Sequence, residues 1–324
     1  MDSIQVILAI AAATFAAAVT FTKAQAATID PASINSATFT GEQLPDGQSP
    51  VAAKLQILLD RAGTSPGVID GYSGENLAKA IRGFEAVNAL PEDGVLDQQV
   101  WDTLQAMGDN VIVSYTITPE DASGLSAPLP SDYAELAKLD SIGYTSVVEK
   151  LGERFHMDED FLQALNPGAA FSAGETIAVA DTGANLEGQV ARLIADKGRA
   201  WLLAYDSTDT LMAIYPVTIG NTDTPSPSGT HTVNGVAIDP TYSYNPENFV
   251  QGDNKEPLTL PPGPNGPVGN VWIDLSEPTY GIHGTPYPAK IDKASSHGCV
   301  RMTNWDAAEL AHMVSNGVPV EFRD

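Results

Sequence analysis

The stretch Ser295-Ser296-His297-Gly298-Cys299-Val300-Arg301-Met302 contains the only cysteine in a chain of 324 residues. A second histidine stands upstream, in Tyr280-Gly281-Ile282-His283-Gly284-Thr285. A free thiol has a pKa of about 8.5, so it needs a base to act as a nucleophile near neutral pH. A lone cysteine, two histidines and tight glycine turns therefore predict a cysteine nucleophile with a histidine base. The alternative for Cys299 is a small buried hydrophobic residue.

These residues resemble the active-site signature of the L,D-transpeptidases, the YkuD-type catalytic domain. The matching parts are His283-Gly284-Thr285, a short loop, and then Ser296 to Met302. Tyr215 to Gly220, followed by Thr224 to Thr230, is similar to that family's strand and its Pro/Gly-rich turn. The resemblance covers residues 186–324 and implies an enzyme that joins peptidoglycan stem peptides through an acyl group on cysteine.

The resemblance also implies roles for individual residues. Cys299 is the expected nucleophile, and His283 is the expected base. The backbone carbonyl of Gly284 is expected to orient the imidazole, because no carboxylate occupies the adjacent positions. The backbone N–H groups of Gly298 and Cys299 are expected to form the oxyanion hole. One such donor typically supplies about 2.7–4 kcal/mol of transition-state stabilisation.

Four further residues are expected to contact substrate: His297, Arg301, Ser296 and Tyr280. His297 either lines the pocket or holds its loop. Arg301 binds either a substrate carboxylate or a structural carbonyl, and the sequence does not separate the two.

A zinc centre is the competing chemistry for the same residues. His283, His297 and Cys299 together with a water would make a catalytic zinc site. A histidine and a cysteine one residue apart on a tight turn are awkward as two ligands of one ion. We therefore expect no metal and no other cofactor.

Composition limits the partners and indicates export. The formal net charge is −25, from 41 acidic and 16 basic residues, which argues against nucleic acid and anionic membrane surfaces as partners.

Ile4 to Phe21 is apolar, and Ala24-Gln25-Ala26 offers a cleavage site, so residues 1–26 are predicted to be a signal peptide. Asp2 in place of a basic residue leaves an uncleaved anchor as the alternative. Either reading predicts the periplasm or cell wall.

Residues 27–50 are rich in small and turn-forming residues and are predicted to be a linker. Residues 51–108 show three helical patterns, separated by Ile69-Asp70-Gly71 and Asp93-Gly94 turns. This segment resembles the peptidoglycan-binding-1 domain, although Glu85 replaces that family's usual glutamine.

Residues 111–181 read as strand, helix, helix and strand, with Leu165-Asn166-Pro167 before the last strand. That order resembles a LysM glycan-binding module. The stretch from Pro119 to Gly143 is too long for a compact LysM turn, so a glycan-binding module and a spacer both remain open. We expect residues 51–180 to target the wall and to take no part in chemistry. His156 in this segment is read as a helix-end or surface residue.

Residues 186–324 are rich in strand patterns, so we expect a mainly β catalytic domain, a sandwich or barrel with one packed helix. Thr303-Asn304-Trp305-Asp306 resembles a capping box that opens that helix. Asn245 to Val268 is rich in Pro, Gly and Asn, and a loop of this length is expected to be a lid.

The resulting hypothesis is an L,D-transpeptidase that either cross-links diaminopimelate stems or attaches a protein to the wall. Its expected partners are peptidoglycan tetrapeptide stems and glycan strands, with carbapenems as covalent inhibitors. Two alternatives remain: an L,D-carboxypeptidase or endopeptidase that hydrolyses the same bonds, and a non-catalytic peptidoglycan-binding scaffold.

Overall fold

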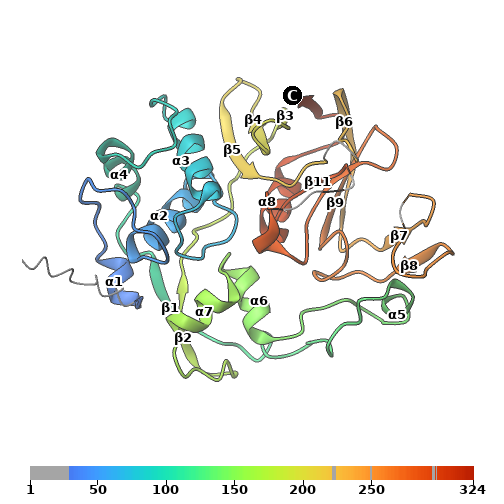
Figure 1. Ribbon diagram of the computed structural model, residues 1–324, viewed down its shortest axis with the longest axis horizontal. Coiled ribbons are helices and arrows are strands. Elements are labelled where there is room, and N and C mark those ends of the chain that lie inside the picture. The colour runs from blue at the N-terminus through green and yellow to red at the C-terminus, as the bar shows by residue number, and fades with distance from the viewer. Residues whose placement is uncertain (1–28, 221–223, 249, 294–295, 297) are drawn as a thin grey trace, which may run out of the picture.

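The computed structural model describes residues 29–220, 224–248, 250–293, 296 and 298–324. Helices α1–α4 lie at one end of the molecule and the large sheet lies at the other, with α8 beside the sheet (Figure 1). The expected signal peptide, residues 1–26, lies outside the described residues. Among the helices from residue 29 onward, none is long and apolar enough to cross a bilayer.

The N-terminal helices are α1 (Pro31–Asn35), α2 (Pro50–Arg61), α3 (Glu75–Val87) and α4 (Gln98–Gln105). Side-chain caps start α2 and α4: Ser49 and Asp97 each accept a backbone hydrogen bond from the first turn. The three helices predicted between residues 51 and 108 are confirmed. The linker prediction is wrong for α1, because Ile34 is fully buried in the helical core.

The two Asp-Gly turns of this region are built alike. Gly71 and Gly94 have φ of +75° and +73°, a conformation that favours glycine. Gln56 Oε1 accepts a hydrogen bond from the Gly71 N–H at 2.7 Å. Glu85 Oε2 accepts one from the Gly94 N–H at 2.8 Å. Glu85 therefore supplies the same kind of acceptor to its turn, and burial raises the pKa of its carboxyl.

The second segment contains β1 (Ile112–Thr116), α5 (Tyr133–Leu136), α6 (Val147–Arg154), α7 (Glu159–Leu165) and β2 (Thr176–Ala180). Strands β1 and β2 pair antiparallel, and α5 lies within the long insertion. The predicted element order is present, while the LysM identity stays a prediction. Buried residues of this segment join those of α1–α4 in one hydrophobic cluster, so the two segments share a core where separate modules were expected.

The C-terminal half is built on one sheet of eight strands in the order β11-β10-β9-β6-β12-β3-β4-β5. The strands are β3 (Arg192–Asp196), β4 (Trp201–Tyr205), β5 (Leu211–Pro216), β6 (Gly229–Ile238), β9 (Val271–Leu275), β10 (Gly281–His283), β11 (Val300–Arg301) and β12 (Pro319–Arg323). A 3-10 turn, η1 (Pro288–Lys290), precedes the cysteine loop. Helix α8 (Asn304–Met313) shares the apolar core of the sheet. The predicted mainly β domain with one packed helix is confirmed.

The start of α8 departs from the predicted capping box in one detail. Thr303 Oγ1 accepts the Asp306 N–H at 3.1 Å, as a cap should. The Asp306 carboxylate instead accepts a hydrogen bond from the Ser65 hydroxyl at 3.0 Å. Ser65 lies just after α2, so the helix is attached to the N-terminal half.

The N-terminal half also covers one edge of the sheet. The Ser65 N–H donates to the Ile214 carbonyl at 3.0 Å, and the Ile214 N–H donates to the Gly63 carbonyl at 2.9 Å. These bonds satisfy backbone groups of the edge strand β5, which would otherwise offer a pairing surface. The two halves are therefore joined by backbone hydrogen bonds as well as by side chains.

The predicted lid segment contains regular structure. Strands β7 (Tyr242–Tyr244) and β8 (Leu258–Leu260) pair antiparallel. They pack with α5 in a third hydrophobic cluster, in which Leu136 and Ile142 meet Tyr244 and Leu260. In Figure 1, α5 reaches this corner of the molecule at the end of a long extension from the helical half.

Candidate active site

Parallel pairing of two short strands brings the predicted nucleophile and base into one cleft. Ile282 and His283 of β10 lie opposite Val300 and Arg301 of β11. Cys299 directly precedes β11. Cys299, His283 and Arg301 all line the same cleft, which has a volume of about 340 Å³.

His283 has the geometry of a neutral base. Its Nδ1 lies 2.6 Å from the Gly284 carbonyl oxygen, so this nitrogen carries the proton that the carbonyl accepts, and Nε2 keeps its lone pair. The Trp272 ring stacks on the imidazole, with centroids 5.6 Å apart and planes at 20°. Burial, reinforced by the charge of Arg301, lowers the pKa of His283 to about 4. The imidazole is therefore unprotonated at neutral pH.

Cys299 rests as a thiol. Burial raises the pKa of Cys299, while the Gly281 backbone and the charge of Arg301 act against that rise. Its Sγ–H contacts the Thr279 carbonyl at 3.8 Å. The cleft thus holds a neutral thiol and a neutral imidazole, so the thiol proton has to move as the sulfur attacks a substrate.

The side-chain hydroxyl of Ser296 bonds backbone groups of the cysteine loop and fixes its conformation. Its hydroxyl donates to the Cys299 carbonyl at 2.6 Å and accepts from the Gly298 N–H at 3.1 Å. Ser296 lines the cleft as predicted, but its hydroxyl is occupied within the loop. The Gly298 N–H, predicted to serve the oxyanion hole, is occupied as well. The Cys299 N–H remains the candidate donor.

A glycine is required at position 298. Its φ is +109°, and a Cβ there would lie 2.6 Å from a ring carbon of Tyr280. Tyr280 lines the cleft as predicted, and its hydroxyl donates to the Pro225 carbonyl at 3.4 Å. His297 lies outside the described residues.

The Pro/Gly-rich turn fixes the cysteine loop from outside. Ser226 Oγ donates to the Gly298 carbonyl at 2.7 Å, and Thr224 Oγ1 donates to the Ser296 carbonyl at 2.7 Å. Sequence reasoning recognised this turn by its resemblance but missed the role of its hydroxyls.

Arg301 is held by its backbone, which exchanges 2.9 Å hydrogen bonds with Thr218 in both directions. Its Nε is buried and has no hydrogen-bond partner among the residues that the structure describes. Its side chain lines the cleft beside Cys299.

Asn304 is a supporting residue that the sequence did not reveal. Its Nδ2 donates to Glu153 Oε1 at 2.8 Å and to the Pro264 carbonyl at 3.1 Å. A Cβ on Gly284 would lie 2.1 Å from Asn304 Oδ1, so Asn304 packs directly against the residue whose carbonyl orients His283.

Within the described residues, no group of three or more His, Cys, Asp or Glu side chains is arranged to hold a metal ion.

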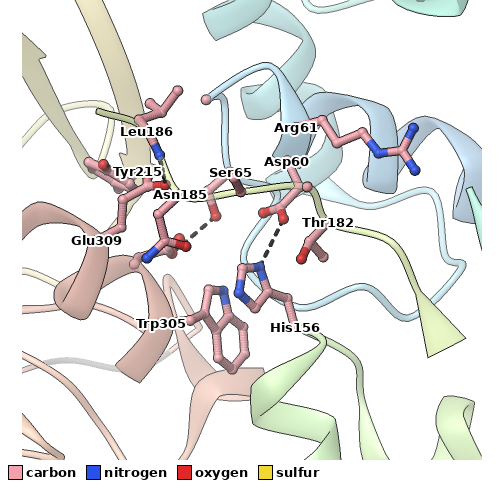
Figure 2. Close-up of a pocket in the computed structure, with 14 residues that line it drawn as sticks. Asp60, Arg61, Ser65, His156, Thr182, Asn185, Leu186, Tyr215, Trp305 and Glu309 are labelled. Carbon is pink, nitrogen blue, oxygen red and sulfur yellow. Dashed lines mark hydrogen bonds and ion pairs between the residues drawn. The ribbon is translucent and has the colours of Figure 1, made fainter. Parts of the chain in front are cut away.

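A second, small polar cavity of about 20 Å³ lies where the two halves meet (Figure 2). His156 Nδ1 pairs with Asp60 Oδ2 at 2.8 Å, and its ring stacks on Trp305 with centroids 5.1 Å apart. Glu309 accepts hydrogen bonds from the Tyr215 hydroxyl and the Leu186 N–H, both at 2.8 Å. His156 does follow a helix, as predicted, but it lies in this joint and not on the open surface.

Comparisons with known proteins agree with these two parts of the chain. Residues 191–322 match the L,D-transpeptidase catalytic domain, and residues 48–104 match the family described as "Putative peptidoglycan binding domain". The "Putative L,D-transpeptidase YkuD" of Bacillus licheniformis is 31% identical over 176 residues, covering 53% of this chain and 91% of that protein.

Two solved structures are also similar. An L,D-transpeptidase from Mycobacterium smegmatis is 20% identical with a TM-score of 0.34, over 47% of this chain and 64% of that chain. An L,D-transpeptidase from Xylanimonas cellulosilytica DSM 15894 is 16% identical with a TM-score of 0.39, over 88% of this chain and 100% of that chain.

Proposed function

This chain belongs to the L,D-transpeptidase family, and on that premise we propose that Cys299 and His283 catalyse acyl transfer between peptidoglycan stem peptides. The observation that carries the proposal is the geometry of the pair in one cleft. His283 is neutral, its Nδ1 is tied to the Gly284 carbonyl, and it lines one cleft with the only thiol. A neutral imidazole can accept the thiol proton at neutral pH.

The proposed reaction has two half-reactions. His283 Nε2 takes the Sγ proton as sulfur attacks the carbonyl at the L-centre of diaminopimelate in a donor tetrapeptide. The tetrahedral intermediate collapses to a thioester, and D-alanine leaves with the proton returned by the imidazolium. An acceptor amine then attacks the thioester, gives its proton to His283, and releases the thiol of Cys299.

Two groups would stabilise the substrate in this scheme. The Cys299 N–H would donate to the developing oxyanion, a position where one donor is worth about 2.7–4 kcal/mol. Arg301 would bind a substrate carboxylate. The absence of a partner for its Nε among the described residues favours this role over a structural one.

The N-terminal half would hold the enzyme at its polymeric substrate. The match of residues 48–104 to a peptidoglycan-binding family places the work of this chain in the cell envelope. Export through residues 1–26 to the periplasm, and glycan binding by residues 111–181, are parts of the same proposal.

The acceptor decides between transfer and hydrolysis. A diaminopimelate amine gives a cross-link, a lysine amine of a protein gives an anchored protein, and water gives a carboxypeptidase or endopeptidase product. The intact pair of Cys299 and His283 argues against a non-catalytic scaffold. A carbapenem is expected to acylate the same sulfur.

The test is mass spectrometry of products from purified disaccharide-tetrapeptide and the full-length protein. We expect a dimer that has lost one D-alanine. A tripeptide alone would assign hydrolysis, and an unchanged donor would overturn the proposed function.

A further inference from the structure

The helical half contributes a wall to the catalytic cleft. Tyr133, the first residue of α5, lines the cleft together with Cys299 and Arg301. It lies in the insertion between residues 119 and 143, which the sequence assigned to wall targeting alone. The sequence did not place this segment at the candidate active site, where Tyr133 lines the cleft.

Tyr133 is held there by the lid segment. Its ring meets those of Tyr242 and Tyr244 edge-on, at centroid distances of 6.1 and 5.3 Å. The side chain of Gln251 makes two hydrogen bonds to the backbone at the start of α5. Its Oε1 accepts the Tyr133 N–H at 3.1 Å, and its Nε2 donates to the Ser131 carbonyl at 2.7 Å.

Backbone hydrogen bonds join the same two segments a second time. The Ile142 N–H donates to the Pro262 carbonyl at 2.9 Å, and the Asn265 N–H donates to the Ile142 carbonyl at 3.1 Å. The insertion and the lid therefore pack as one body, around the third hydrophobic cluster.

The charge of the cleft points to the class of ligand. The chain has a net charge of −25, yet none of the described residues that line the cleft is Asp or Glu. Arg301 lines it, with its Nε buried and without a partner in the described part of the chain. An arginine with a buried, unpartnered Nε in a cleft that no described carboxylate lines favours an anionic ligand, and a carboxylate matches the planar guanidinium.

We propose that Tyr133 is a specificity-determining residue, and that with Tyr242 and Arg301 it forms a subsite for a carboxylate of the donor stem peptide. The two rings line the cleft together with Arg301, one from the helical half and one from the lid segment. Apolar ring surface beside an ion pair displaces water, which strengthens the attraction between a guanidinium and a carboxylate. This inference rests on the proposed function, because it names the substrate group that the same cleft selects.

Binding is the appropriate readout, because it does not require turnover. The full-length Cys299→Ala protein is titrated calorimetrically with a tetrapeptide stem bearing free carboxylates, and with the same stem converted to carboxamides. We expect the carboxylate form to bind at least about tenfold more tightly, as for hydrogen bonds to charged groups. In the same background, Tyr133→Ala should weaken binding of the carboxylate stem about three- to tenfold.

Two further variants separate a contact from a fold effect. Tyr133→Phe keeps the ring and its packing, so it should bind as the parent does. Leu139→Ala removes an exposed side chain from the same insertion and should change nothing. The proposal is overturned if Tyr133→Ala binds like the parent, if both stems bind equally, or if neither binds. Turnover by the wild-type protein tests the proposed function separately.

Discussion

Two histidines of this molecule share an environment, yet their pKa values shift in opposite directions. His283 in the catalytic cleft and His156 in the joint between the halves are both largely buried, and each stacks on a tryptophan at an interplanar angle of 20° or less. Burial with the charge of Arg301 lowers the pKa of His283 to about 4. Burial also acts to lower the pKa of His156, but Asp60, Asp306 and Glu309 outweigh it and raise that pKa.

Burial acts in the same direction on both imidazoles, and the sign of the neighbouring charge is what differs between the two sites. An imidazole beside a guanidinium stays neutral and can accept a proton from a thiol. A neighbouring carboxylate favours the protonated imidazole and raises its pKa. The same residue type is thus the proposed base in the cleft and the partner of Asp60 in the joint.

The largest expected effect comes from exchanging the two histidines for alanine. His283→Ala should slow acylation of Cys299 by about 10²–10⁴, the usual range for a positioned general base. His156→Ala should lower thermal stability, because Asp60 is left in the joint without its partner, and it should leave the acylation rate within a few-fold of wild type. Single-turnover kinetics and thermal unfolding measure the two effects. Equal loss of activity in both variants would remove the distinction.

A smaller effect is expected for the pH dependence of stability. Burial and the charge of Asp60 raise the pKa of Asp306 to about 8. An acid whose pKa is raised on folding costs stability as pH rises from about 4 through about 8. Asp306→Asn removes that cost, so it should stabilise the protein at pH 8 by on the order of 1–3 kcal/mol and have little effect at pH 4. Thermal unfolding at both pH values checks this. A variant with the wild-type pH dependence would show that Asp306 does not carry it.

The smallest effects are paired shifts of the histidine titrations themselves. Arg301→Gln removes a cation, so the pKa of His283 should rise from about 4 toward its ordinary value. Asp60→Asn removes the main partner of His156, so the pKa of His156 should fall. Nuclear magnetic resonance of ring-labelled histidine follows both titrations. A pKa of His283 that is insensitive to Arg301 would show that burial alone keeps it neutral.

The sequence predicted what is local in the chain. Cys299, His283 and the Gly284 carbonyl lie within seventeen positions, and the short strands that align them follow from that order. The Thr303 cap of α8 is equally local, since it is made within four residues.

The sequence could not predict contacts between distant segments. Asp60 and His156 are separated by 96 positions, and Glu153 and Asn304 by 151. The periodicity of apolar residues within a helix or strand does not predict contacts over such separations. Tyr133 was missed for the same reason: its insertion has no internal pattern that connects it to the lid. Helix α1 was missed because five residues are too few to show helical spacing.

The central claim is that the thiol of Cys299 carries the acyl group, and the mass of the intact protein tests it most directly. After incubation with a donor tetrapeptide, the wild-type protein should gain the mass of the donor less D-alanine, and the Cys299→Ala protein should gain nothing. An adduct of the same mass on Cys299→Ala, or products released by that variant, would contradict the account.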